Sequence, residues 1–490
     1  MELNGIVESL VNKNILITGS TGFLAKIFVE KVLRTQPNVK KLFLVVRAEN
    51  TKSAKQRLHD EVIGKDLFKL LKEKHGAKFD SFISNKVTPV VGDISCKDLG
   101  VQNSDLKKKM FNEIDIIVNI AATTNFDERY DVALGINTWG AKHVLDFAKN
   151  CAKLEMLLHV STAYVCGERS GLILEKPFKM GETLNGNSGL DIEQELKLAQ
   201  EKRNALHAQE ATKEEELAAM KELGMQRSRL YGWPNTYAFT KAMGEMLLGH
   251  LRENVPVCIV RPTIITSTYS EPFPGWVEGI RTIDSLAVGY GKGKVTCFLG
   301  DYDLILDLIP GDMVVNAMIV AMVVNANQPK EFIYQVGSSL ANPMKCTFFR
   351  DIAFSYFSKN PWINKDGKAV RVHKAKLFTS AASFQRHMTL SYLLPLKGLQ
   401  VVNAAMCNYF RHTYSDTSRK IKFVLRLVEL YTPYIFFKGI FDDTNLETLR
   451  MEMSRHETEA KTFYFDPKII DWEEYFMNIH LPGIVRYVFK

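Results

Sequence analysis

The segment "TGSTGFLA" (Thr18–Ala25) decides the fold, because its glycines join a short apolar run to a helical pattern. The run "NILIT" (Asn14–Thr18) predicts a buried strand, and "FLAKIFVEKVLRT" (Phe23–Thr35) predicts the helix after it. In such a unit the first glycine permits the sharp turn, and the second lets backbone N–H groups approach a pyrophosphate. Ala25 stands where the third glycine of the G-x-x-G-x-x-G pattern belongs. A dinucleotide-binding turn is therefore expected at Gly19, Ser20, Thr21, Gly22, Phe23 and Leu24.

Further strand-like runs alternate with helical stretches, which is typical of a parallel sheet wrapped by helices. We expect these strands at Lys40–Val46, Lys86–Ile94, Ile114–Ala122, Glu155–Val165, Val255–Ile265 and Phe332–Ser339. The sequence thus predicts an α/β fold with a Rossmann-type doubly wound parallel sheet over residues 1–360. A charged, alanine-rich stretch at 191–223 predicts a helical insertion, either a solvated helical pair or part of a lid. After a polar linker near 358–367, residues 365–490 are expected to form a basic, mostly helical C-terminal domain.

The tip of the second strand indicates which dinucleotide the turn binds. An acidic residue there suits the ribose of NAD, whereas a basic residue holds the 2′-phosphate of NADP. Arg47 occupies the tip, two residues before Glu49, and a guanidinium binds phosphate through two parallel hydrogen bonds. We therefore expect NADPH; the alternative is an exposed Arg47 with Glu49 reading the ribose. The ends of the later strands should line the same cleft. The residues expected there are Asp93, Ile94, Ala121, Thr123 and the neighbouring pair Arg261 and Pro262.

The stretch "WPNTYAFTKAMGE" (Trp233–Glu245) places Tyr237 and Lys241 one helical turn apart. Four Tyr-x-x-x-Lys pairs occur in the chain, so the spacing alone decides nothing. Only this pair follows a strand that ends in hydroxyl residues, Ser161 and Thr162, at the ligand-binding edge of the sheet. The other three lie in a glycine-rich stretch, across a proline, or after the dinucleotide domain: Tyr290/Lys294, Tyr464/Lys468 and Tyr434/Lys438.

Together these blocks resemble the extended short-chain dehydrogenase/reductase family and, within it, the plant-type alcohol-forming fatty acyl-CoA reductases. The resemblance covers essentially the whole chain and includes "AATTNFDERYDVALGINT", "LLHVSTAYVCGE", "RPTIITSTYSEPFPGW" and "YTPYIFFKGIFDD". It implies NADPH as hydride donor, a long-chain acyl-CoA as substrate and a primary fatty alcohol as product. Two successive hydride transfers would pass through an aldehyde, in lipid biosynthesis of the wax or suberin kind.

The predicted catalytic residues are Thr162, Tyr237 and Lys241. Tyr237 would protonate the carbonyl oxygen as hydride attacks the carbon, and Lys241 would lower the pKa of the phenol and bind the ribose. Thr162, aligned by the resemblance, would hydrogen-bond the same oxygen, with Ser161 as the alternative. Cys166 offers a rival route through an acyl-cysteine, although direct hydride transfer needs no nucleophile. No metal site is expected.

The cysteine content and the charge distribution indicate the cellular compartment in which the protein works. Seven scattered cysteines without a C-x-x-C pair indicate reduced thiols, and the N-terminus has no signal or transit pattern. We therefore expect a protein on the cytosolic side, peripheral to the endoplasmic reticulum membrane. Lys365–Val428 carries twelve Lys or Arg residues against two Asp residues. This segment is a solvated basic face, a rim for the phosphates of CoA, or a surface for anionic lipid headgroups. Nucleic acid is not expected, since no recognition motif accompanies the charge.

A long acyl chain requires an apolar tunnel beside the site. The stretch "EPFPGWVEGI" (Glu271–Ile280), with Trp276, is either a wall of that tunnel or a packed structural loop. Two rival functions remain open at this point: a nucleotide-sugar or sterol dehydrogenase or epimerase of the same fold, and a non-catalytic dinucleotide-fold binding protein. The sequence does not indicate the preferred chain length or the oligomeric state.

Overall fold

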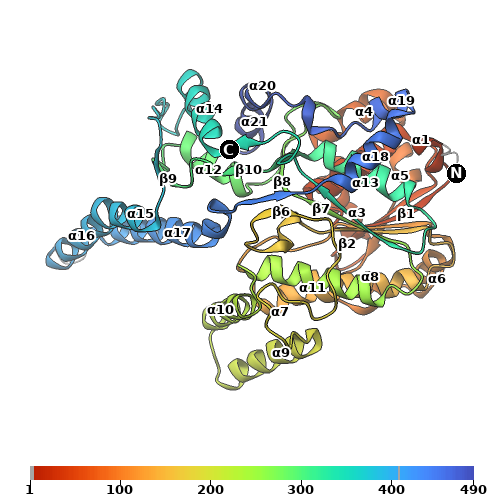
Figure 1. Ribbon diagram of the computed structural model, residues 1–490, viewed down its shortest axis with the longest axis horizontal. Helices are drawn as coiled ribbons and strands as arrows, with labels where there is room; N and C mark the ends of the chain where they lie inside the picture. The colour runs from red at the N-terminus through yellow and green to blue at the C-terminus, as the bar shows by residue number, and fades with distance from the viewer. Residues whose placement is uncertain (1–4, 407–408, 490) are drawn as a thin grey trace.

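A seven-stranded parallel sheet forms the centre of the computed structural model, which describes residues 5–406 and 409–489 (Figure 1). The strand order is β12-β7-β5-β4-β1-β2-β3. The chain runs outward from β1 to β3 and then returns to place β4 on the other side of β1, so the topology switches between β1 and β4. Ligands of such sheets bind at this switch, outside the carboxyl ends of the strands. The strands are β1 (Asn14–Thr18), β2 (Lys41–Val46), β3 (Val87–Val91), β4 (Ile116–Asn119), β5 (Met156–Val160), β7 (Val257–Pro262) and β12 (Glu331–Val336).

Both faces of the sheet are covered, which explains why its strands read as continuous apolar runs. Along β1, Ile15 and Ile17 pack into one core cluster and Leu16 packs into the other. The first cluster includes helices α2 (Phe23–Thr35) and α13 (Gly311–Val324). The second includes α6 (Ser104–Glu113) and α8 (Gly140–Lys149). The predicted first strand and first helix match β1 and α2.

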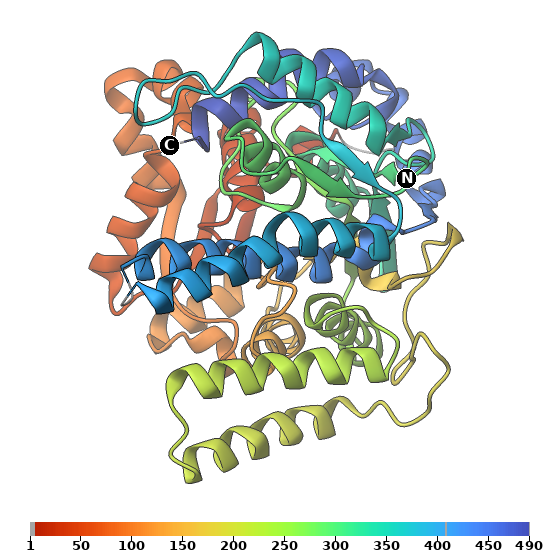
Figure 2. The same ribbon diagram turned by 90° about the vertical axis from the view of Figure 1, so that its left-hand side faces the viewer.

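The predicted insertion at 191–223 forms two helices, α9 (Ile192–Ala208) and α10 (Lys213–Leu230), at one end of the molecule (Figure 2). Its inner face is apolar and packs in a cluster with α11 (Thr236–Leu251), the helix of the Tyr-Lys pair. A buried carboxylate fixes the packing: Glu195 accepts from Tyr130 at 2.6 Å and from Arg227 Nε at 3.0 Å. The insertion is thus a helical pair anchored to the helix that carries Tyr237.

The C-terminal region first projects from the body and then returns to it. Helices α15 (Ala381–Met388), α16 (Leu394–Ala405) and α17 (Arg411–Ile435) form the arm at the left of Figure 1. Beyond it, β15 (Gly439–Phe441) pairs with β6 (Gly171–Ile173), and Trp472 and Tyr475 join the core cluster of α2. The division into predicted domains 1–360 and 365–490 stays a prediction. The first residue of the first domain and the last residue of the second, residues 1 and 490, lie outside the described residues.

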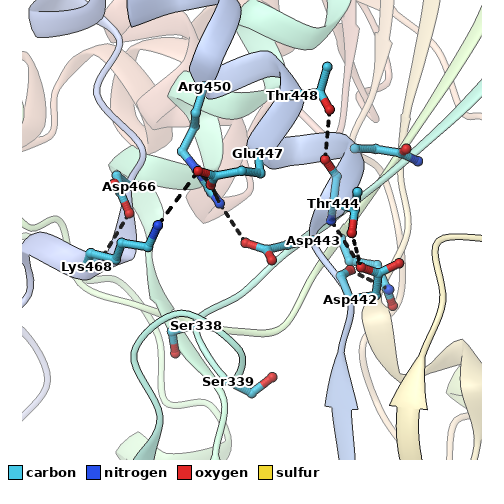
Figure 3. Close-up of polar contacts among 12 residues, drawn as sticks. Ser338, Ser339, Asp442, Asp443, Thr444, Glu447, Thr448, Arg450, Asp466 and Lys468 are labelled. Carbon is cyan, nitrogen blue, oxygen red and sulfur yellow. Dashed lines mark hydrogen bonds and ion pairs between the residues drawn. The ribbon is translucent and has the colours of Figure 1, made fainter.

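Ion pairs hold the start of the returning segment in place (Figure 3). Arg450 on α18 (Thr444–Ser454) donates from Nη2 to Asp443 at 2.7 Å and from Nε to Glu447 at 2.6 Å. Asn445 on the same helix donates to the carbonyl oxygen of Ile333 in β12 at 3.0 Å. The C-terminal segment is therefore tied to the edge strand of the main sheet.

Candidate functional site

The predicted dinucleotide turn lies at the switch point of the sheet. Gly19 has φ +68°, and a Cβ added there would lie 2.7 Å from the backbone nitrogen of Ala121 after β4. Glycine is therefore required by both the backbone conformation and the close approach of the two strand ends. Gly22 is exposed at the N-cap of α2, so the first N–H groups of that helix are open to an anion. These features fit a pyrophosphate.

Inside the turn, the side chains face different ways. Ser20 is buried and donates from Oγ to the carbonyl oxygen of Ile17 at 3.0 Å, so its hydroxyl stabilises the turn itself. Thr21 is half-buried, and Leu24 lies in the core. Phe23 stacks on Trp276 with ring centroids 5.1 Å apart, which places the predicted tunnel loop against the turn.

The other predicted cofactor residues lie where the strands end. Arg47 is exposed directly after β2, and its carbonyl oxygen accepts from Arg57, a second guanidinium that the sequence did not single out. After β3, Asp93 accepts from the backbone of Ser95, while Ile94 is buried. Pro262 ends β7, one strand beyond β5.

Thr123 is connected to the catalytic helix through Asn137. Asn137 Oδ1 accepts from Thr123 N at 3.0 Å, and Asn137 Nδ2 donates to Thr240 Oγ1 on α11, also at 3.0 Å. Asn137 lies in the π-helical segment Leu134–Trp139, which packs on α11. Only its place after the fourth predicted strand marks Asn137 in the sequence.

Tyr237 and Lys241 lie on α11, whose first turn is capped by Asn235 accepting from Ala238 N at 2.9 Å. The Thr162 hydroxyl, at the end of β5, lies near enough to the Tyr237 phenol to lower its pKa, and it accepts from Tyr164 N at 3.3 Å. The structure thus places two of the three predicted catalytic groups beside each other. Lys241, one turn along the helix, points to the sheet: Nζ donates to Val160 O at 2.7 Å and contacts His159 Nε2 at 3.1 Å.

Burial governs the protonation of these two groups in the protein chain. It raises the pKa of Tyr237 to about 12, and the Thr162 hydroxyl and the charge of Arg281 oppose the shift only in part. Burial also lowers the pKa of Lys241 to about 8, against the attraction of Glu245. Within the protein chain, burial outweighs the groups that lower the pKa of Tyr237. That Lys241, together with an oxidised nicotinamide, makes the phenol more acidic stays a prediction. Tyr237 is a fully protonated donor at neutral pH.

An aromatic cluster beside Tyr237 was missed in the sequence. Tyr434, near the end of α17, accepts from Asn235 Nδ2 at 2.7 Å. The centroid of its ring lies 5.1 Å from that of Phe126 and 5.2 Å from that of Tyr164. Phe126 in turn stacks on Tyr237, with ring centroids 6.0 Å apart. The Tyr434/Lys438 pair follows the dinucleotide domain along the chain, which argues against a catalytic role for the pair. In the structure Tyr434 nevertheless lies next to Phe126, the ring that stacks on Tyr237.

The structure also shows the surroundings of three other residues considered for the site, Arg261, Cys166 and Ser161. Arg261 is buried and pairs through Nη2 with Glu245 on α11 at 2.5 Å, so its charge is compensated inside the fold. Burial raises the pKa of the Cys166 thiol to about 12, which disfavours the thiolate that an acyl-cysteine route needs. Ser161 Oγ is buried with no hydrogen-bond partner among the described residues, whereas Thr162 accepts from Tyr164 N at 3.3 Å.

Neither a metal-binding cluster nor a membrane-spanning helix is found among the described residues. Across residues 5–406 and 409–489, no cluster of three His, Cys, Asp or Glu side chains is arranged to hold a metal ion. In those same ranges no helix combines the length and apolar character needed to cross a bilayer.

Comparison with known proteins gives matches along the full chain. Two family models, both described as "Male sterility protein", match residues 17–318 and 391–490. The "Alcohol-forming fatty acyl-CoA reductase" of Simmondsia chinensis is 56% identical over 489 residues, covering 99% of both chains. "Fatty acyl-CoA reductase 1" of Arabidopsis thaliana is 53% identical over 493 residues and covers 100% of both chains.

Solved structures match at the level of the fold. The terminal R domain of the myxalamid PKS-NRPS pathway superposes with a TM-score of 0.57 at 16% identity, covering 97% of this chain and 91% of that one. The reductase domain of a nonribosomal peptide synthetase from Mycobacterium tuberculosis gives 0.57 at 17% identity, with 99% and 94% covered. The predicted Rossmann-type fold with a helical C-terminal region is confirmed.

Proposed function

This chain belongs to the fatty acyl-CoA reductase family, and we propose that it takes its hydrides from NADPH and uses Thr162, Tyr237 and Lys241 for the chemistry. It is an oxidoreductase that reduces a fatty acyl-CoA to a fatty alcohol. An NAD(P)-binding domain is present; the choice of NADPH is supported by Arg47, exposed at the tip of β2.

The residues of the turn suit a dinucleotide. The glycine cradle at Gly19 leaves no room for a side chain, and Gly22 opens the N-terminus of α2 to phosphate. When bound, NADPH supplies the hydride that attacks the acyl carbon. Arg47 would bind the 2′-phosphate, while Asp93, Ile94, Ala121, Thr123 and Pro262 line the strand ends beside the nucleotide.

The observation that carries the catalytic proposal is the placement of Thr162 beside Tyr237 at the edge of the sheet, near enough to lower the pKa of the phenol. Tyr237 holds its proton at neutral pH and gives it to the carbonyl oxygen as negative charge develops there. Thr162 stabilises the same oxygen, a contribution of about 3 kcal/mol for one such donor. Lys241 would orient the nucleotide through its ribose.

The reaction requires two rounds, and in each round one hydride is added to carbon while Tyr237 gives one proton to oxygen. The first round converts the thioester to a thiohemiacetal, which expels CoA as the thiol and leaves an aldehyde. The second round converts the aldehyde to the alcohol. Purified protein incubated with palmitoyl-CoA should oxidise two NADPH for each alcohol formed and should leave UDP-sugars unchanged. Oxidation of NADPH with a UDP-sugar and not with acyl-CoA would refute the assignment.

The long-chain specificity is supported by the apolar wall beside Tyr237. Phe126 stacks on Tyr237 and contacts Tyr434, which in turn contacts Tyr164. Phe437 and Phe441 extend the cluster, with ring centroids 5.7 and 5.4 Å from that of Tyr164. Burying each CH₂ of an acyl chain there gains about 0.8 kcal/mol. The predicted region 365–490 thus contributes to the acyl site through the end of α17, beside the predicted domain of residues 1–360.

We also propose that the arm formed by α15, α16 and α17 rests on the cytosolic surface of the endoplasmic reticulum membrane. Val401 and Tyr409 are 70% and 78% exposed near its end, where an apolar side chain gains from contact with lipid. A groove of about 650 Å³ between α16 and α17 is lined by Arg411, Arg419 and Lys422, which suit anionic headgroups.

Sedimentation of the full chain with vesicles tests this contact. Vesicles containing phosphatidylserine should bind the wild-type protein at low salt, and Val401→Asp should weaken the binding. Leu172→Asp, at another exposed apolar side chain on β6, is the matched control. Equal binding by both variants and the wild type would contradict the role of the arm.

A further inference from the structure

The buried side of Lys241 is part of a hydrogen-bonded chain that the proposed mechanism does not use. Lys241 and His159 are each 1% exposed. Lys241 Nζ lies 2.7 Å from the carbonyl oxygen of Val160 and 3.1 Å from His159 Nε2. The other ring nitrogen of His159 faces Asn119 on β4. The imidazole therefore joins the catalytic helix to the strands that end at the dinucleotide turn.

The Thr18 hydroxyl sets the direction of this chain. It accepts from Ala121 N at 3.2 Å and, because it is fully buried, gives its own hydrogen to Asn119 Oδ1 at 2.6 Å. The amide nitrogen of Asn119 is then the atom that faces His159 Nδ1, at 2.9 Å. Because an amide N–H only donates, Nδ1 accepts. A neutral imidazole that accepts at Nδ1 carries its hydrogen on Nε2.

That hydrogen points at Lys241. An ammonium group has three donors and no acceptor, whereas a neutral amine has a lone pair. The contact between His159 Nε2–H and Lys241 Nζ therefore favours the neutral amine, which can still donate to Val160. We propose that His159 is a positioning residue that stabilises the neutral form of Lys241 and so makes this lysine exchange a proton in the working pH range. The inference rests on the catalytic role proposed for Lys241.

The charges around the pair agree with this assignment. Burial lowers the pKa of Lys241 to about 8, and burial, with the charge of Lys241, lowers the pKa of His159 well below its ordinary value. Glu245, the next turn of α11, attracts a proton to Lys241. Its carboxylate is bound by Arg261 on β7 at 2.5 Å, so much of that attraction is compensated.

The remaining titratable neighbours are uncharged near neutral pH. Tyr237 faces the cleft from the same helix, and burial raises its pKa to about 12. Cys166 lies in the 3₁₀ turn Ala163–Cys166, which packs on α11, and burial raises the pKa of its thiol to about 12. The hydrogen bond from His159 is thus the contact that discriminates most directly between the two forms of Lys241.

The first test reads the tautomer without any substrate. The chain has 11 histidines, and in ¹⁵N-histidine-labelled protein the His159 signals are identified by their loss in His159→Gln. The proposal predicts a neutral ring protonated at Nε2 that does not titrate between about pH 6 and pH 8. A ring protonated at Nδ1, or one that titrates near the ordinary histidine pKa of about 6.5, would overturn it.

The second test is the pH profile of kcat. In His159→Gln the amide oxygen can accept from the ammonium, so the pKa of Lys241 rises and the alkaline limb moves up by about one pH unit. His250→Gln, at the exposed end of α11, is the matched control and leaves the limb in place. A His159→Gln enzyme that loses rate equally at every pH would contradict the proposal. An inactive wild-type protein would refute the proposed function instead, and would leave the tautomer measurement intact.

Discussion

Asn235 Nδ2 donates to the hydroxyl of Tyr434 at 2.7 Å, and this bond joins the N-cap of the catalytic helix to the end of the projecting helix α17. Asn235 also caps α11 through its side-chain oxygen. One residue therefore fixes the start of the helix that carries Tyr237 and positions the aromatic wall beside it. The arm and the helix that carries the proposed proton donor meet at this contact.

Tyr434→Phe removes the hydroxyl and keeps the ring. Because a net hydrogen bond contributes about 1 kcal/mol, we expect the KM for palmitoyl-CoA to rise by roughly three- to tenfold with the protein still folded. Steady-state kinetics across acyl chain lengths measures it. Tyr409→Phe, on the exposed part of the arm, is the control. A KM unchanged in Tyr434→Phe would remove Tyr434 from the acyl site.

The two hydroxyls at the end of β5, of Ser161 and Thr162, should contribute unequally to kcat. The Thr162 hydroxyl lies beside Tyr237 and lowers the pKa of its phenol, whereas Ser161 Oγ has no hydrogen-bond partner among the described residues. We expect Thr162→Ala to lower kcat by about 10²–10³-fold and Ser161→Ala by less than tenfold. Equal losses, or a larger loss for Ser161→Ala, would transfer the oxygen-binding role to Ser161.

Arg47 should decide between the two dinucleotides. Arg47→Glu removes the guanidinium and places a like charge beside a 2′-phosphate, so NADPH binding should weaken far more than NADH binding. Fluorescence titration with each reduced nucleotide measures the ratio of the two dissociation constants. Loss of affinity by the same factor for both would assign Arg47 to another role.

Lys241 should make stability depend on pH in a defined direction. Its pKa is about 8 in the folded chain and 10.5 as the ordinary value, so between these pH values the unfolded chain binds more protons. The free energy of unfolding of the wild type, relative to Lys241→Met, should therefore rise with pH across this window by up to about 1.4 kcal/mol per unit. Urea unfolding of both proteins at several pH values measures it. A difference that is flat, or that falls with pH, would contradict the buried lysine.

Local patterns predicted the sheet, because each strand and its helix obey short-range rules of periodicity and turn chemistry. The stretch that holds Gly19 also predicted where a nucleotide would bind. Tyr434 could not be placed in this way, because nearly 200 residues separate it from Tyr237 along the chain. The pKa of Tyr237 likewise depends on burial, which only the packed structure supplies. The ion pair of Arg261 with Glu245 could not be predicted either, because it depends on how α11 packs on β7.

Alcohol formation by Tyr237→Phe is the most direct test of the central claim, since this change removes one hydroxyl and leaves the ring beside Phe126. With palmitoyl-CoA and NADPH, we expect the wild type to release fatty alcohol and the variant to release none above background, with unchanged thermal stability. Alcohol produced by Tyr237→Phe at the wild-type rate would show that another group donates the proton.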